Sequence, residues 1–297
     1  MPTSPAQPLL LDGRRAAEAW KEEIHSQIQT HALRPGLAVL LVGEHPASLT
    51  YVHHKQRDAL EVGIDCIIHR FSATASYQEL FETIDALNRD PTVHGILVQL
   101  PLPAHIQTEA LLEAVDPSKD VDGFHPYNVG QLALGGDGFV PCTPLGVDRL
   151  CHHYKLSLGG MEVVILGRSR VVGKPLMLLW SQKRTGGSPT VTLAHSESRD
   201  LPSICRRADL LVVATGHHHL VTPAFVKPGA IVVDVGMHIH ESSTGKSKLS
   251  GDVCFEEVAP LCRAITPVPG GVGPMTRASL LFNTLKSAKR FQDSSHL

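Results

Sequence analysis

A serine, a tyrosine and a lysine have the spacing of a single polar stripe on a helix. Ser48, Tyr51 and Lys55 are three and four residues apart, so in a helix their side chains share one face. A buried lysine with polar partners can lose its proton near neutral pH, which makes it a general base or proton donor. The same stripe also fits a solvated helix face, the usual setting of a lysine.

Two more polar residues fall where they could reach the same ligand. Gln99 ends a predicted buried strand, at the edge where open α/β sheets bind ligands. Asp122 stands in a glycine-bounded loop after the next predicted helix. Each also fits a purely structural role, because Gln99 could cap neighbouring backbone and Asp122 could fix a turn.

A glycine-rich turn follows the predicted strand at residues 162–166. Gly167, Arg168, Ser169 and Gly173 precede an apolar helix at 176–180. Glycines let the backbone approach a phosphate, and a helix N-terminus offers free N–H groups. The spacing is not G-x-G-x-x-G, so a plain strand-to-helix turn remains an alternative.

The end of the next strand bears on the choice of nucleotide. It reads Ala194-His195-Ser196, whereas an NAD enzyme usually places an acid there to hold the ribose hydroxyls. Ser196 and Arg168 could instead hold the 2'-phosphate of NADP, although Glu197 argues against this. The sequence therefore favours NADP.

The elements that must position these residues alternate between buried strands and amphipathic helices. Such alternation indicates βαβ units and an α/β fold. The predicted strands cover residues 37–42, 64–69, 95–100, 162–166, 190–194, 210–214 and 230–235. The predicted helices include 14–33, one beginning at Ser76 with Glu79 in a capping box, 109–115 and 275–291.

This pattern predicts two α/β domains flanking a cleft, the second a Rossmann-like NAD(P)-binding domain. The first comprises residues 1–144 with 275–297, and the second comprises 145–274. A glycine-rich segment at 265–276, before the last helix, is either a connector or a backbone that approaches a flat ligand closely. Residues 241–250 are predicted to be a mobile loop.

Composition excludes several classes of partner. Lys plus Arg total 27 and Asp plus Glu 29, so no basic field favours nucleic acid or a membrane surface. The six cysteines form no C-x-x-C pair, and neither a signal peptide nor a long apolar run is present, which indicates a cytoplasmic protein with reduced thiols. The histidine clusters lack accompanying ligands at metal spacing, so no metal is expected.

Seven stretches, in order along nearly the whole chain, resemble the methylenetetrahydrofolate dehydrogenase/cyclohydrolase family. They are YVHHK at 51–55, GILVQLPLP at 95–103, KDVDGF at 119–124, PCTP at 141–144, residues 167–169 with Gly173 and Pro175, GDV at 251–253, and PVPGGVGPMT at 267–276.

The resemblance implies a multifunctional enzyme of one-carbon metabolism that also serves purine biosynthesis. It would oxidise 5,10-methylenetetrahydrofolate with NADP and then hydrolyse the methenyl product to 10-formyltetrahydrofolate. Lys55 would be essential to hydrolysis, tuned by Gln99, while Tyr51 orients the folate and Asp122 holds the pterin ring. Family members are typically homodimers.

The resemblance also implies two sets of binding residues. The folate contacts would be Ser48, Tyr51, Val52, Lys55, Val98, Gln99, Leu100, Asp122, Pro269, Gly270 and Gly273. The NADP contacts would be Gly167, Arg168, Ser169, Gly173, His195, Ser196, Thr215, Gly216 and Met237.

The chain departs from the family pattern in three places: His45, the segment 216–219, and the pair Met237-His238. The last two bear on cofactor affinity. Two other functions remain open, namely a different two-domain dehydrogenase of shikimate or amino-acid type, and a folate- or nucleotide-binding module without turnover.

Overall fold

The computed structural model describes residues 7–183, 185, 187–241 and 247–294. Its internal contacts divide the chain into two compact units. The six-stranded unit comprises Met1–Ala17 and Thr143–Thr276, and the three-stranded unit comprises Glu18–Cys142 and Arg277–Leu297.

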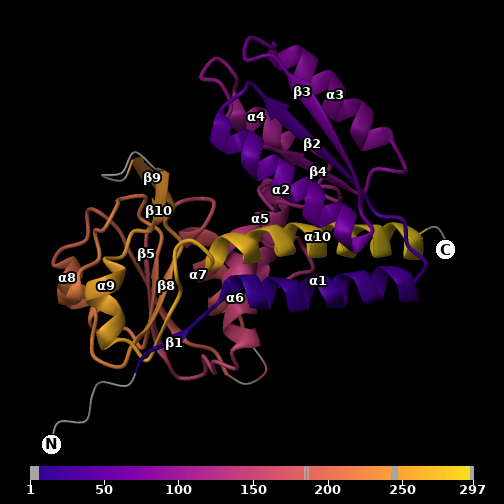
Figure 1. The fold of residues 1–297 in the computed structure, drawn as a ribbon. Helices are drawn as coiled ribbons and strands as arrows, with labels where there is room; N and C mark the ends of the chain where they lie inside the picture. The colour runs from indigo at the N-terminus through magenta and orange to yellow at the C-terminus, as the bar shows by residue number, and fades with distance from the viewer. Residues whose placement is uncertain (1–6, 184, 186, 242–246, 295–297) are drawn as a thin grey trace, which may run out of the picture. The chain divides into compact units, whose positions relative to one another are not determined.

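The six-stranded unit is built on a parallel sheet in the order β1-β11-β8-β7-β5-β6. Figure 1 labels β1, β5 and β8 of this sheet. Its strands are β1 (Leu9–Leu10), β5 (Glu162–Leu166), β6 (Thr190–Ala194), β7 (Leu210–Val213), β8 (Ile231–Asp234) and β11 (Ala264–Ile265). Its helices are α6 (Cys142–His153), α7 (Gly173–Ser181), α8 (Leu201–Cys205) and α9 (Phe255–Val258), with 3-10 turns η1 (Pro223–Phe225) and η2 (Ala259–Leu261).

The central strands of this sheet are apolar because both of their faces are covered. Val164 and Leu166 pack into a core cluster that also contains Cys205 of α8 and Val258 of α9. The intervening residue Ile165 is also fully buried, on the opposite face. A continuous apolar run is the pattern expected of such a strand.

Strand order makes β5 the point at which the chain changes direction across the sheet. From β5 the chain continues to β6 on one side, and then returns to β7 on the other side. Open parallel sheets bind ligands beyond the carboxyl ends of their strands at such a point. The loop after β5 therefore lies where a nucleotide site is expected.

A small antiparallel hairpin, β9 (His238–Glu241) with β10 (Ser247–Ser250), follows the sheet strand β8. The predicted mobile loop at 241–250 is therefore wrong for Glu241, which belongs to β9, and for residues 247–250, which pair with β9. Period-2 alternation in so short a polar segment gives little sign of a strand. Residues 242–246 of that prediction lie outside the described part of the chain.

The three-stranded unit has a parallel sheet in the order β3-β2-β4. Its strands are β2 (Gly36–Val42), β3 (Asp65–Phe71) and β4 (Gly95–Val98). Its helices are α2 (Pro46–Val62), α3 (Tyr77–Arg89), α4 (Thr108–Glu113) and α5 (Pro126–Leu134). Helices α1 (Gly13–Thr30) and α10 (Val272–Ser294) each begin in the six-stranded unit and end in this one.

One face of β2 and β4 packs against α3 and α4 in a single core cluster (Figure 1). Leu80 and Ile84 of α3 are fully buried there. The predicted start of α3 is confirmed, since Ser76 Oγ accepts a hydrogen bond from the Glu79 amide at 3.2 Å.

Both units thus combine parallel sheets with helices, which confirms the predicted α/β class. Each predicted strand overlaps an observed one, and 162–166 and 190–194 match at both ends. The short strands β1, β9, β10 and β11 were not predicted. Among the described residues, no helix is long and apolar enough to cross a membrane.

Candidate active site

Lys55 is a buried lysine on α2, the helix that directly follows β2. Its side chain is 7 % exposed and its Nζ donates to Gln99 Oε1 at 2.9 Å. Burial lowers the pKa of Lys55, because desolvation disfavours the ammonium form; the charge of Asp122 opposes this shift and that of Arg277 adds to it. The alternative of a solvated helix face is therefore wrong for Lys55.

Gln99 is held at the end of β4 so that its oxygen faces the lysine. Its amide Nε2 donates to the Leu100 carbonyl at 2.6 Å, and its backbone N–H donates to Leu40 of β2 at 2.9 Å. With the nitrogen occupied in this way, Oε1 is the atom left to accept from Lys55.

Tyr51 and Asp122 complete the surroundings of Lys55. Lys55 Nζ lies 4.7 Å from the centroid of the Tyr51 ring, close enough for a cation–π contact when the amine is charged. Burial raises the pKa of Asp122, with Lys55 acting in the opposite direction. It also raises the pKa of Tyr51, so the phenol stays protonated at neutral pH.

Cys142 belongs to this cluster, although sequence reasoning placed it only within a matching stretch. The residue is 3 % exposed, and its thiol donates to the Val121 carbonyl with 3.4 Å between Sγ and O. Burial raises its pKa well above the usual range, and the charge of Asp122 adds to this rise. Nothing local in the sequence signals this neighbourhood, because the segment of Cys142 and that of Lys55 meet only in the folded unit.

The other predicted folate residues of this unit differ in exposure. Leu100 is half-buried, whereas the other three are buried: Ser48 is 8 % exposed, Val52 1 % and Val98 3 %. Val98 packs within the core cluster beneath the sheet. The structure thus brings Tyr51, Lys55, Gln99 and Asp122 together, and places the two valine side chains in the interior.

The predicted phosphate turn lies directly after β5 and is tightly folded. A Cβ atom on Gly167 would lie 2.1 Å from the Ala214 carbonyl oxygen, and one on Gly173 would lie 1.8 Å from that of Gly167. Only glycine fits at these two positions. Ser169 Oγ accepts from the Val172 amide at 3.0 Å, just before α7 begins at Gly173.

Arg168 and Glu197, the cation and the anion that bear on the choice between NADP and NAD, face each other. Arg168 Nη2 lies 2.8 Å from Glu197 Oε1, and both side chains are exposed. Ser196 is exposed beside them in the sequence, and His195 Nδ1 accepts from the Glu197 amide at 3.3 Å. All of these residues lie beyond the carboxyl ends of β5 and β6, as predicted.

Asp252 organises the turn after β7 and was missed as a site residue. It is fully buried, and its Oδ2 accepts from the Thr215 N–H at 2.6 Å, the Thr215 hydroxyl at 2.8 Å and the Gly216 N–H at 3.0 Å. His238 Nε2 lies 2.7 Å from its Oδ1. The only sequence signal was the stretch 251–253, which resembles the family without indicating a role.

Met237, Pro269, Gly270 and Gly273 also belong to the six-stranded unit. Met237 is 62 % exposed. The Gly270 carbonyl accepts from the Gly13 amide at 2.8 Å, so the glycine-rich loop is anchored to the start of α1. A Cβ atom at Gly273 would meet no atom within 4 Å.

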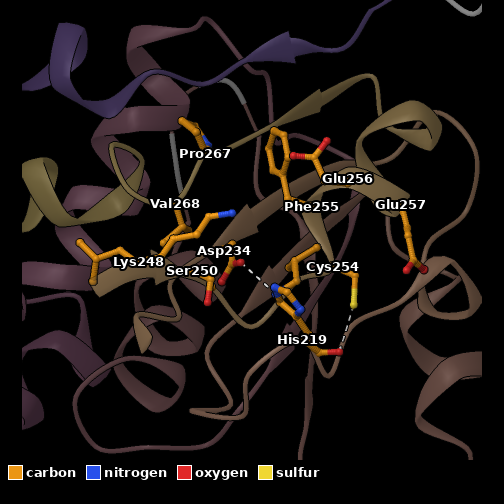
Figure 2. Close-up of a pocket in the computed structure, with 13 residues that line it drawn as sticks. His219, Asp234, Lys248, Ser250, Cys254, Phe255, Glu256, Glu257, Pro267 and Val268 are labelled. Atoms are coloured by element: carbon orange, nitrogen blue, oxygen red, sulfur yellow. Dashed lines mark hydrogen bonds between the residues drawn. The ribbon is translucent and has the colours of Figure 1, made fainter. Parts of the chain in front are cut away.

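A cavity of about 440 Å³ lies in the six-stranded unit beside the β9–β10 hairpin (Figure 2). Asp234, at the end of β8, contributes to its wall together with His219, Cys254 and Val268. The residues predicted for the two sites lie outside its described lining. The histidines at 217–219 are exposed, and within the described ranges no group of three histidine, cysteine or acidic side chains could hold a metal ion.

Comparison with known proteins identifies the family. Residues 11–122 match the model of the tetrahydrofolate dehydrogenase/cyclohydrolase catalytic domain, and residues 141–292 match that of its NAD(P)-binding domain. The chain is 49 % identical to the bifunctional protein FolD of Cereibacter sphaeroides over 94 % of both chains. It is 46 % identical to that of Enterococcus faecalis, over 95 % of this chain and 98 % of the relative.

Solved structures agree with these matches. The FolD methylenetetrahydrofolate dehydrogenase/cyclohydrolase of Campylobacter jejuni is similar with a TM-score of 0.87 and 47 % identity, over 95 % of this chain and 98 % of that one. The Trypanosoma brucei enzyme, solved with NADP cofactor and an inhibitor, has a TM-score of 0.89 and 35 % identity, over 96 % and 98 %. The chain therefore belongs to the tetrahydrofolate dehydrogenase/cyclohydrolase family.

Proposed function

We propose that this enzyme oxidises 5,10-methylenetetrahydrofolate to 5,10-methenyltetrahydrofolate with NADP and hydrolyses the product to 10-formyltetrahydrofolate. The observation that carries the proposal is the buried Lys55 amine, hydrogen-bonded to Gln99 in a chain that also presents a glycine phosphate turn after β5. Family membership favours this function over a shikimate-type or amino-acid dehydrogenase.

Lys55 moves protons in the hydrolytic step. Because burial lowers its pKa, a larger fraction of the amine is uncharged near neutral pH than for an exposed lysine. An uncharged amine accepts one proton from the attacking water and returns it to the departing nitrogen of the folate. The remaining hydroxyl proton leaves to solvent as the formyl C=O forms, so hydrolysis of the methenyl cation releases one proton overall. Gln99 Oε1 accepts a hydrogen bond from one N–H of Lys55. The lone pair and the other N–H groups of the amine are therefore directed away from β4.

Tyr51 and Asp122 bind the substrate. The Tyr51 ring lies beside the Lys55 amine and offers a flat surface for stacking on the pterin. The Asp122 carboxyl accepts hydrogen bonds from the pterin ring nitrogens, and its raised pKa lets it share a proton with them. Ser48, Val52, Val98 and Leu100 supply further contacts, the two buried valines through their backbone.

The nucleotide is held by the segments that follow β5, β6, β7 and β8. NADP, when bound, accepts the hydride from the one-carbon bridge. The amides around Gly167 and Gly173 and the start of α7 bind the pyrophosphate. Arg168 and Ser196 bind the 2'-phosphate, whereas Thr215, Gly216 and Met237 contact the rest of the nucleotide, with Asp252 holding the turn at Thr215.

The remaining proposals concern organisation. The folate-binding domain comprises residues 1–144 with 275–297, except for the segment 7–17, and the NADP-binding domain comprises 145–274. The prediction differs from the structure at 7–17, because strand β1 in this segment pairs with β11 in the sheet of the six-stranded unit. Pro269, Gly270 and Gly273 form a loop of the NADP-binding domain that contacts the folate. The enzyme acts in the cytoplasm as a homodimer. The six cysteines, all of which lie in the described ranges, form no disulfide, which supports a reducing compartment. Sedimentation velocity tests the dimer.

Turnover measured by absorbance tests the proposed function. The purified chain is mixed with methylenetetrahydrofolate and either NADP or NAD, and the formation of reduced nucleotide is followed together with decay of the methenyl intermediate. Both signals are expected with NADP. Binding of folate and nucleotide without either signal would leave a binding module without turnover.

A further inference from the structure

The ion pair between Arg168 and Glu197 lies beyond the carboxyl ends of β5 and β6, where Rossmann-type folds select between the ribose hydroxyls of NAD and the 2'-phosphate of NADP. Leu166 and Ala194, the last residues of β5 and β6, are register partners. Arg168 lies two residues beyond the first strand end and Glu197 three beyond the second. Their side chains then meet at 2.8 Å across the gap between the two loops.

These two groups have opposite preferences for the ribose of the nucleotide. A carboxylate at this edge accepts hydrogen bonds from the ribose hydroxyls of NAD, and an arginine accommodates the 2'-phosphate of NADP. The chain carries both, in direct contact. A 2'-phosphate bears about two negative charges, so it must take the guanidinium from Glu197 and is repelled by the carboxylate that it displaces.

Exposure makes such an exchange feasible. The Arg168 side chain is 44 % exposed and that of Glu197 is 75 % exposed. Ion pairs between exposed side chains are weak and readily rearranged. Glu197 can therefore swing away from Arg168 when the phosphate arrives, and can remain paired with it when the ribose carries only hydroxyls.

We propose that Glu197 determines nucleotide specificity by competing with the 2'-phosphate for Arg168, so that the enzyme uses NAD as well as NADP. This inference rests on the proposed function, and specifically on the role of Arg168. In this proposal the Glu197 carboxylate repels the 2'-phosphate and weakens NADP binding, whereas the neighbouring Arg168 guanidinium attracts it.

The test compares Glu197→Gln and Glu197→Ala with the wild type in kcat/KM for NADP and for NAD. Removing the carboxylate frees Arg168 and abolishes the repulsion, so the ratio of kcat/KM for NADP to that for NAD is expected to rise about five- to tenfold. Glu113→Gln, an exposed glutamate on α4, removes the same charge far along the chain and is expected to leave the ratio unchanged.

A binding measurement separates this inference from the proposed activity. The affinities of 2',5'-ADP and 5'-AMP are measured by calorimetry for the same variants, with no folate present. Selective tightening of 2',5'-ADP in both Glu197 variants supports the competition. An unchanged ratio in turnover and binding overturns it while the enzyme activity stands, whereas absence of turnover in the wild type refutes the proposed function itself.

Discussion

Lys55, which is buried, donates to the partly buried Gln99 and so joins α2 to the end of β4, with 2.9 Å between Nζ and Oε1. The amine is thus removed from solvent yet keeps a neutral acceptor. A neutral partner satisfies an N–H without the charge that would favour the ammonium form. This relationship is the physical basis of the first two predictions.

Lys55→Met is expected to lower the hydrolysis of methenyltetrahydrofolate by at least about 10²-fold, because no other group would replace the amine as a proton carrier. Folate binding should persist, since methionine fills a similar volume. Absorbance decay of the methenyl compound measures the rate, and equilibrium fluorescence measures binding. Undiminished hydrolysis would remove Lys55 from the mechanism.

Gln99→Glu places a negative charge beside the amine and should raise the pKa of Lys55. If the uncharged amine is the active form, hydrolysis in the wild type rises with pH through this pKa, and the variant's rise shifts to higher pH. A profile of kcat/KM against pH locates both midpoints. Gln99→Met is the uncharged control, and a profile that does not move in Gln99→Glu would contradict the pairing.

Arg168→Ala is expected to weaken NADP by about 10- to 100-fold, the loss expected for a charge-assisted hydrogen bond of about 1.5–3 kcal/mol. NAD should change far less, since it lacks the phosphate that the guanidinium binds. KM values for both nucleotides provide the measurement. Equal losses would refute the assignment of the 2'-phosphate to Arg168.

Gly173→Ala tests the compactness of the phosphate turn. The added Cβ would lie 1.8 Å from the Gly167 carbonyl oxygen, so the turn must open, at a cost of about 1–3 kcal/mol in unfolding free energy. NADP affinity should fall as well. Gly130→Ala in α5, where a Cβ meets nothing within 4 Å, should be neutral or stabilising. Urea unfolding compares the two, and an equally stable Gly173 variant would contradict the geometry.

Asp234 should make stability depend on pH. Burial raises its pKa from 3.8 to about 6. The hydrogen bonds that its carboxylate accepts from the backbone N–H groups of Val253, Asp252 and Gly236 offset part of this rise. The folded state therefore binds more protons than the unfolded state between these values, and stability falls as pH rises through this window. Unfolding free energies at about pH 4 to 7 should decline less steeply in Asp234→Asn.

The slope, rather than the absolute stability, is the readout for Asp234→Asn, because the amide also loses an acceptor. Asp293→Asn, an exposed residue near the end of α10, serves as the control for losing a carboxylate. Identical slopes in the wild type and Asp234→Asn would show that this carboxyl does not titrate differently on folding.

The sequence by itself determined the main elements, because burial on two faces demands an apolar run and a helix face demands its own period. Residues 162–166 and 190–194 were predicted at both ends, and the stripe of Tyr51 and Lys55 followed from helical geometry alone. The glycines at 167 and 173 were likewise evident, since few other residues tolerate so tight a turn.

The tertiary structure decided which of these elements meet. Several contacts join segments that are distant in sequence. Cys142 lies near Lys55, Asp252 accepts hydrogen bonds from the turn at Thr215, and β1 pairs with β11. Both strands of the β9–β10 hairpin also escaped prediction. Local periodicity records whether a side chain is buried but carries no information on what covers it, so strand order and packing settle these contacts.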